Sequence, residues 1–151
     1  MALFKFIHLV AVLIWVGGMF FAYVVLHPAS AESLDTSPRL RLWSAALGIF
    51  FNWVWAAVGV VLITGFYLIY LYGGIAHVSR QGYLMLLLGL VMMVIHGYMF
   101  FTSYVPFSLH VSKQRWKEAA VPLSKMRKLF AVNLALGLLI VSIVLIGKSH
   151  M

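Results

Sequence analysis

Four long apolar segments dominate the pattern of hydrophobic and polar positions along the chain. They cover about residues 3–27, 43–72, 83–105 and 126–147. A helix rising about 1.5 Å per residue needs about 20 apolar residues to cross roughly 30 Å of hydrocarbon. The pattern therefore predicts four transmembrane helices. All four prolines, together with Gly73, Gly74 and Gly82, fall in the linkers between them, over 28–42, 73–82 and 106–125, where such residues commonly break helices.

The linkers between the four segments predict how the helices pack. In a bilayer, each spanning segment must satisfy its own backbone hydrogen bonds, which favours helices over open sheets. Consecutive helices joined by short loops pack antiparallel. The expected fold class is therefore an all-α integral membrane protein, with residues 1–151 forming a single domain, an antiparallel bundle of four transmembrane helices. Small residues such as Gly17, Gly18 and Gly59 mark expected contacts between helices.

The composition supports the membrane assignment. Of the 151 residues, 64% are hydrophobic and 9% are charged, whereas about 25% are charged in a typical soluble domain. Cysteine is absent, which excludes disulfides, thiolate metal sites and cysteine nucleophiles. The first apolar run is longer than the roughly 7–15 residues of a signal-peptide core, so we interpret it as a retained helix.

The distribution of basic residues predicts the orientation in the membrane. One side of the predicted bundle carries Arg39, Arg41, Lys113, Arg115, Lys117, Lys125, Arg127 and Lys128, and the other carries Lys5, Arg80 and Lys148. Lysine and arginine accumulate in cytoplasmic loops. The linkers over 28–42 and 106–125 are therefore expected in the cytoplasm and both termini outside it. The positive charge is explained by topology, and no nucleic-acid partner is expected.

Polar side chains within the predicted spans are few, and none is a carboxylate. They are His8, Asn52, Thr64, His96, Ser103, Asn133 and Ser142. A transporter or acid–base enzyme that uses membrane-embedded carboxylates is therefore not expected. An ionisable side chain inside a bilayer is costly unless its polar atoms are bound, so His8 and His96 are candidate functional residues. A hydrogen bond to a neighbouring helix, without any cofactor, is the alternative explanation.

Two imidazoles on facing helices of a bundle can bind a b-type haem as axial ligands. Counting from the predicted outer boundary, His8 is about 9 Å deep and His96 about 16 Å deep, an offset that helix tilt can absorb. Trp15 is one of several aromatic residues suited to line the macrocycle. Arg80 or His77 is then expected near the haem propionates at the outer surface.

Copper is the main alternative to haem. His8 and His77, and less favourably His27, could bind copper ions that pass inward. Cu(I) prefers soft thioether or thiolate ligands, and the chain has no cysteine and no methionine cluster at the outer entrance. Met92, Met93 and Met99 lie near His96 but are expected to pack in the bundle. A third alternative is an accessory membrane subunit without a cofactor, and no catalytic residue is assigned.

The segment His8-x6-Trp15-x-Gly17-Gly18 resembles the first helix of the bacterial copper-resistance CopD membrane domain. The resemblance continues, in the same order, through Arg39-Leu-Arg41-Leu-Trp43, Thr64-Gly65 and Gly82-Tyr-Leu84-Met-Leu, over roughly Phe4 to Phe107. The four-helix layout, with histidines in the first and third helices, is also similar to that of the HemJ-type protoporphyrinogen oxidases. Those proteins are linked to a bound b haem.

The resemblance implies a multi-pass protein of the bacterial inner membrane that binds haem b through His8 and His96. Its implied role is redox or electron transfer, and an oxidoreductase activity like that of protoporphyrinogen oxidase is left open. Copper transport or binding of the CopD type stays as the alternative. The expected partners are the lipid bilayer and a redox partner or quinone, and a homo-oligomer is left open.

Overall fold

A computed structural model describes residues 1–146, apart from the side chain of Leu145, and this part of the chain contains no β-strand. The helical elements are α1 (Ala2–Phe20), η1 (Phe21–Leu26), α2 (His27–Ser33), α3 (Thr36–Leu71), η2 (Ile75–His77), α4 (Arg80–Met99), η3 (Phe100–Tyr104), α5 (Val105–Ser112) and α6 (Trp116–Ile146). Here η1 and η3 are single π-helical segments, and η2 is a 3₁₀ turn.

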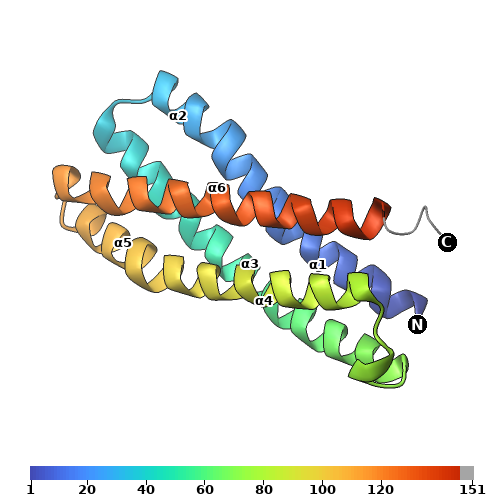
Figure 1. Ribbon diagram of the computed structural model, residues 1–151. Helices are drawn as coiled ribbons and strands as arrows, with labels where there is room; N and C mark the ends of the chain where they lie inside the picture. The colour runs from blue at the N-terminus through green and yellow to red at the C-terminus, as the bar shows by residue number, and fades with distance from the viewer. Residues whose placement is uncertain (147–151) are drawn as a thin grey trace.

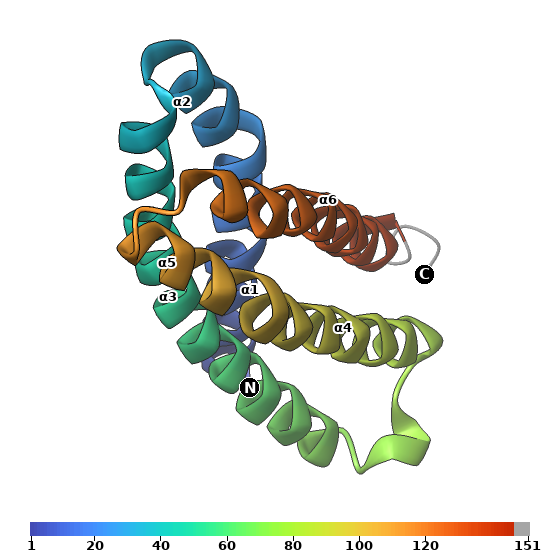
Figure 2. The ribbon, with the colours of Figure 1, turned by 90° about the vertical axis from the view of Figure 1, so that its left-hand side faces the viewer.

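These elements join into four long helical stretches that run alternately up and down (Figures 1 and 2). The stretches long and apolar enough to cross a membrane are Ala2–Ser33, Thr36–Leu71, Arg80–Ser112 and Trp116–Val144. The N-terminus and the α3–α4 connection lie at one end of the bundle, and the α2–α3 and α5–α6 connections lie at the other (Figure 1). The sequence-based prediction of an all-α protein with four membrane-spanning helices is confirmed.

The predicted ends of the first and third helices were wrong, because proline does not terminate either of them. Pro28 and Pro106 each occupy the first turn of a continuing helix, α2 or α5, where a missing N–H is tolerated. The π-helical segments η1 and η3 come directly before these turns. Such a widened turn accommodates a proline ring that would otherwise clash with the carbonyl of the preceding turn.

The fourth helix also begins earlier than predicted. It starts at Trp116 rather than near residue 126, and Pro122 lies inside it. The connection before it consists only of residues 113–115, and Gln114 adopts the left-handed conformation with φ of 57°. The predicted linker over 28–42 likewise shortens to residues 34–35. The two connections at this end are therefore tight turns between helices.

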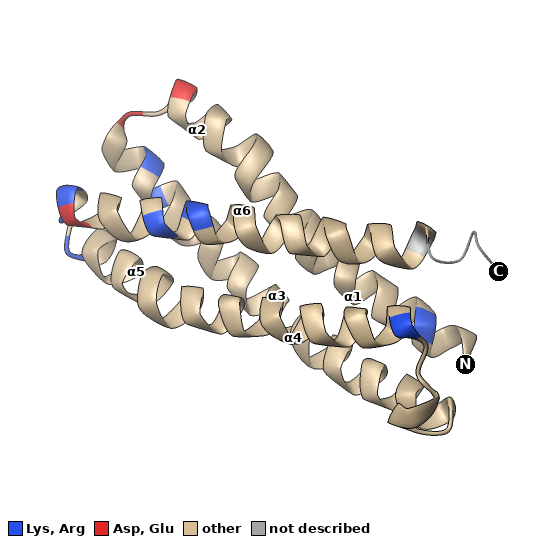
Figure 3. Cartoon of the chain, viewed as in Figure 1, with Lys and Arg blue, Asp and Glu red and all other residues tan. Residues whose placement is uncertain are grey.

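Charged residues separate along the bundle axis. Figure 3 shows most lysines and arginines at the end that carries α2 and the start of α6, and a small group at the opposite end. Lys5 near the start of α1 and Arg80 at the start of α4 lie at that opposite end, and Lys148 lies outside the described residues. The arrangement agrees with the charge separation inferred from the sequence, while the direction of insertion stays a prediction.

The core lies between the helices, and the outward faces are apolar. Met19, Phe51, Met99, Phe107 and Met126 are fully buried. Large apolar side chains such as those on α3 and α4 are exposed on the outside, as expected for surfaces that face lipid. α1 packs chiefly against α3, and α4 against α6.

Only some of the small residues provide close contacts between helices. A Cβ atom at Gly18 would lie 2.8 Å from a ring carbon of Phe50, and one at Gly137 would lie 2.8 Å from Val16. At Gly17 and Gly59 a Cβ atom would meet open space. The prediction of a contact is therefore confirmed for Gly18 and wrong for Gly17 and Gly59, while Gly137 was missed.

Candidate functional site

His8 lies between α1 and α3 and is held by Thr64. Its Nδ1 atom is 2.8 Å from Thr64 Oγ1, and the Thr64 hydroxyl is 2.6 Å from the backbone oxygen of Val60. Because the threonine hydroxyl donates its proton to that carbonyl, His8 must donate from Nδ1, which leaves a lone pair on Nε2. The His8 ring packs on α3 beside Gly65, where a Cβ atom would lie 3.4 Å from His8 Cε1, an ordinary van der Waals contact. Histidine ligands of metals are commonly oriented in the same way, by a hydrogen bond from the ring nitrogen that does not bind the metal.

His96 lies in the middle of the bundle and is fully buried. Its ring is surrounded by aromatic side chains from two other helices. The ring centroids of Phe51, Trp55 and Trp15 lie 5.1, 5.2 and 5.8 Å from that of His96. Phe50 adds a fourth aromatic ring at 6.5 Å.

Several buried polar atoms, two of them on His96, have no hydrogen-bond partner within the described residues. They are Nδ1 and Nε2 of His96, Nε1 of Trp15, both amide atoms of Asn133 and the hydroxyl of Ser103. Leaving one buried polar group unpaired costs about 1–3 kcal/mol. Buried atoms of this kind are candidates to bind water, an ion or another ligand.

Two methionines flank His96 along its own helix. Met92 and Met99 lie four residues before and three residues after it, so all three share one face of α4. Both methionines are buried. An imidazole between two thioethers is a donor set suited to a soft, monovalent metal such as Cu(I).

Further polar groups continue from His96 along the same helical stretch towards the end that carries most of the basic residues. Ser103, within the π-helical segment η3, and His110, on α5, follow at intervals of seven residues. Ser103 is fully buried, and the buried Nδ1 of His110 has no hydrogen-bond partner within the described residues. With His8 nearer the other end, these groups form a sparse polar series along the bundle.

The structure does not bring His8 and His96 to one point. Trp15 contacts His96, whereas His8 precedes Trp15 by seven residues, which is about 10 Å along α1. On α3, Thr64 and Trp55 are nine residues apart, which gives about 13 Å. Imidazole nitrogens bind a metal at about 2 Å, so the geometry gives no support to a haem shared by these two residues.

The other residues predicted for the site lie in three separate places. Trp15 faces His96, as described. His77 is exposed in the α3–α4 connection and donates from Nδ1 to the Gly73 carbonyl oxygen at 3.0 Å, and Arg80 is exposed at the start of α4. His27 lies near the opposite end, its ring 6.3 Å from that of Trp43. The structure does not place His8, His77 and His27 together.

Asn133 and Thr64 are the site residues that sequence reasoning noted without assigning a role. Asn133 is a fully buried amide on α6, and Thr64 orients His8. The signal for both was a polar residue inside a predicted span. Among the residues that the structure describes, no group of three or more His, Cys, Asp or Glu side chains could hold a metal ion, so any metal site here needs other donors.

Comparisons with known proteins give one match. A family model described as copper resistance protein D, CopD, matches residues 44–146, which is more than half of the chain. The match includes most of α3 and all of α4, α5 and α6, and it overlaps the resemblance found in the sequence while leaving out the first helix. No curated protein and no solved structure matches the chain.

Proposed function

The chain belongs to the CopD family and is a multi-pass membrane protein related to copper resistance; from this premise we propose that it binds Cu(I) within the bundle and passes it across the membrane. Copper is here the cargo. His96 is the proposed central ligand, with Met92 and Met99 as thioether donors. His8 is the proposed ligand nearer the end that carries the N-terminus.

One observation carries this proposal. His96 is fully buried, both of its ring nitrogens lack partners within the described residues, and a buried thioether lies on each side of it along α4. A neutral imidazole supplies a lone pair for the metal without adding charge to the core. Thioethers select Cu(I) over harder ions. The two buried methionines beside His96 therefore support copper binding, although the sequence shows no methionine cluster at the outer entrance.

The positions of the other polar groups support transfer along the bundle. His8 is oriented by Thr64 and keeps a lone pair on Nε2. Ser103 and His110 continue the polar series beyond His96. Polar groups spaced along the bundle would lower the cost of placing an ion there, since a charge in bare hydrocarbon is very costly.

The aromatic rings around His96 favour a second candidate, a b-type haem with His96 as an axial ligand and a redox role. Trp15, Phe51 and Trp55 would contact the macrocycle, and the protein would tune the iron through axial ligation and burial. His8 does not fit as the second axial ligand, for the reason given above. Electron transfer through a haem would require a redox partner or quinone, whereas copper transfer would not.

A binding experiment separates the two candidates. The protein is purified in detergent, its visible spectrum is recorded in oxidised and reduced forms, and Cu(I) binding is measured by competition with a coloured Cu(I) chelator under anaerobic conditions. We expect no haem bands and tight Cu(I) binding, which is lost in His96→Leu and weakened in Met99→Leu. His77→Leu is the control, because that exposed ring bonds only its own loop. A haem spectrum that disappears in His96→Leu supports the second candidate and contradicts the first.

A further inference from the structure

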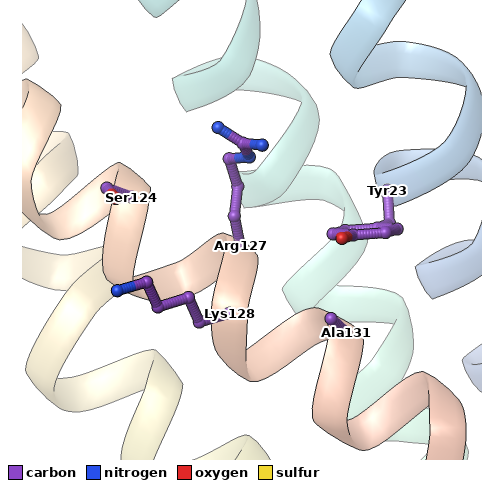
Figure 4. Close-up of a pocket in the computed structure, with 5 residues that line it drawn as sticks. All are labelled: Tyr23, Ser124, Arg127, Lys128 and Ala131. Carbon is purple, nitrogen blue, oxygen red and sulfur yellow. The ribbon is translucent and has the colours of Figure 1, made fainter.

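A pocket lies between the first and fourth helical stretches, near the end rich in basic residues. It has a volume of about 330 Å³ and is lined by Tyr23, Ser124, Arg127, Lys128 and Ala131. Tyr23 belongs to η1 and the other four to α6. Figure 4 shows Tyr23 facing α6 across from Ala131, with the Arg127 and Lys128 side chains extending from the same helix.

The lining of this pocket is suited to an anion. It carries two permanent cations and two hydroxyl groups. The only acidic side chains of the chain are Glu32, Asp35 and Glu118, and none of them lines the pocket. The small side chain of Ala131 leaves room beside the tyrosine ring. The guanidinium of Arg127 can bind two oxygens of one phosphate at once, whereas Lys128 supplies a mobile point charge.

The depth of the pocket identifies the source of the anion. From Arg127 to the end of α6 at Ile146 the helix is about 29 Å long, close to the roughly 30 Å thickness of bilayer hydrocarbon. Arg127 and Lys128 therefore lie where hydrocarbon meets the phosphate groups of the lipids. Val132, one turn deeper on α6, is half exposed and offers an apolar surface to an acyl chain.

We propose that this pocket is a binding site for the phosphate headgroup of an anionic phospholipid. In Figure 4 the side chains of Arg127 and Lys128 point in different directions, so on binding both turn towards the phosphate, and the hydroxyls of Ser124 and Tyr23 border the pocket on either side. Basic pockets between transmembrane helices are known to bind such headgroups. The pocket is separate from His96 and the aromatic rings around it, so the lipid proposal does not depend on the proposed copper function.

A neighbouring lysine is held by contacts within the protein and is less available to bind an anion. Lys125 lies one turn nearer the start of α6, and its ammonium donates to the Tyr98 hydroxyl at 2.9 Å and to Thr102 Oγ1 at 3.2 Å. It also lies 4.5 Å from the centroid of the Tyr98 ring. This contact joins α6 to α4 and η3. The Lys125 ammonium already has partners within the protein, and it does not line the pocket with Tyr23 and Arg127.

Native mass spectrometry of the full chain in detergent tests the proposal, with phosphatidylglycerol and phosphatidylcholine titrated as probes. We expect phosphatidylglycerol to bind with higher affinity, and Arg127→Gln/Lys128→Gln to weaken it about thirtyfold, since each basic residue contributes about one factor of five. The matched control is Lys113→Gln/Lys117→Gln, which removes the same charge at the same end but outside the pocket; it should change the affinity by less than about threefold.

Two further measurements keep the outcome unambiguous. Tyr23→Phe retains the ring and the fold and removes only the hydroxyl, so it should weaken phosphatidylglycerol binding severalfold. Glycerol phosphate, the soluble headgroup, should compete weakly, because it lacks the acyl chains that the site faces. Equal loss in both double variants, equal binding of the two lipids, or competition by glycerol phosphate at the affinity of the lipid would each overturn the proposal.

Discussion

Replacing His96 by leucine should stabilise the metal-free protein while abolishing its response to copper. The imidazole is fully buried, and neither ring nitrogen has a partner within the described residues. Leucine fills a similar volume among Phe51, Trp55 and Trp15 without any polar atom that needs a partner. A residue retained at a cost in stability is expected where function requires it.

The size of the effect follows from the unpaired nitrogens. One buried polar group without a hydrogen bond costs about 1–3 kcal/mol, so the leucine variant should gain a free energy of unfolding in this range. For a chain of this length, each kcal/mol raises the melting temperature by about 2–4 °C. Cu(I) at a hundred times its dissociation constant should stabilise the unmodified protein by about 2.7 kcal/mol and the variant not at all.

The assay is thermal unfolding in detergent, followed by the fluorescence of the tryptophans, with and without Cu(I) under reducing conditions. Met99→Leu is the control for repacking, because this swap conserves volume and should cost less than about 1.5 kcal/mol in the metal-free protein. If His96→Leu lowers the melting temperature of the metal-free protein by several degrees, the imidazole makes favourable contacts within the fold, and the reasoning from unpaired atoms is refuted.

Three other predictions test the packing, the orientation of the first histidine and the topology. Gly18→Ala should destabilise the bundle by about 1–3 kcal/mol in thermal unfolding, because its Cβ would lie 2.8 Å from an aromatic carbon of α3; Gly17→Ala, with open space at the same site, should have no such effect. Thr64→Val should cost about 0.5–1.5 kcal/mol through loss of the 2.8 Å hydrogen bond to the α1 histidine, and unchanged stability would contradict that role. Because the chain has no native cysteine, Ala76→Cys should be labelled in intact cells by an impermeant thiol reagent and Lys113→Cys only after lysis; the reverse pattern would invert the predicted topology.

The sequence predicts the number of helices well because apolar length decides it. It predicts their ends less well, since proline was treated as a terminator. Pro28 and Pro106 instead lie in the first turn after a π-helical segment, where the backbone widens around the ring. A helical stretch can therefore continue through a proline when the preceding turn adjusts. Such a local adjustment leaves no mark in the pattern of apolar residues.

The site was predicted only in part for a different reason. A histidine within a hydrophobic segment is recognisable at once, so His8 and His96 were found. Which residues meet them depends on how each helix is rotated and how far it slides along its neighbour. A helix that faces lipid on one side and protein on the other is apolar all round, so the sequence marks no inward face. Helix packing alone brings His8 to Thr64 and places aromatic rings around His96.

X-ray absorption at the copper edge, on the purified protein loaded with one equivalent of Cu(I), reports directly which atoms bind the metal. We expect a metal bound by imidazole nitrogen and thioether sulfur, with the spectrum changed or the copper lost in His96→Leu and preserved in His77→Leu. A wild-type protein that takes up no copper, or a His96→Leu variant with the same spectrum as wild type, would contradict this expectation.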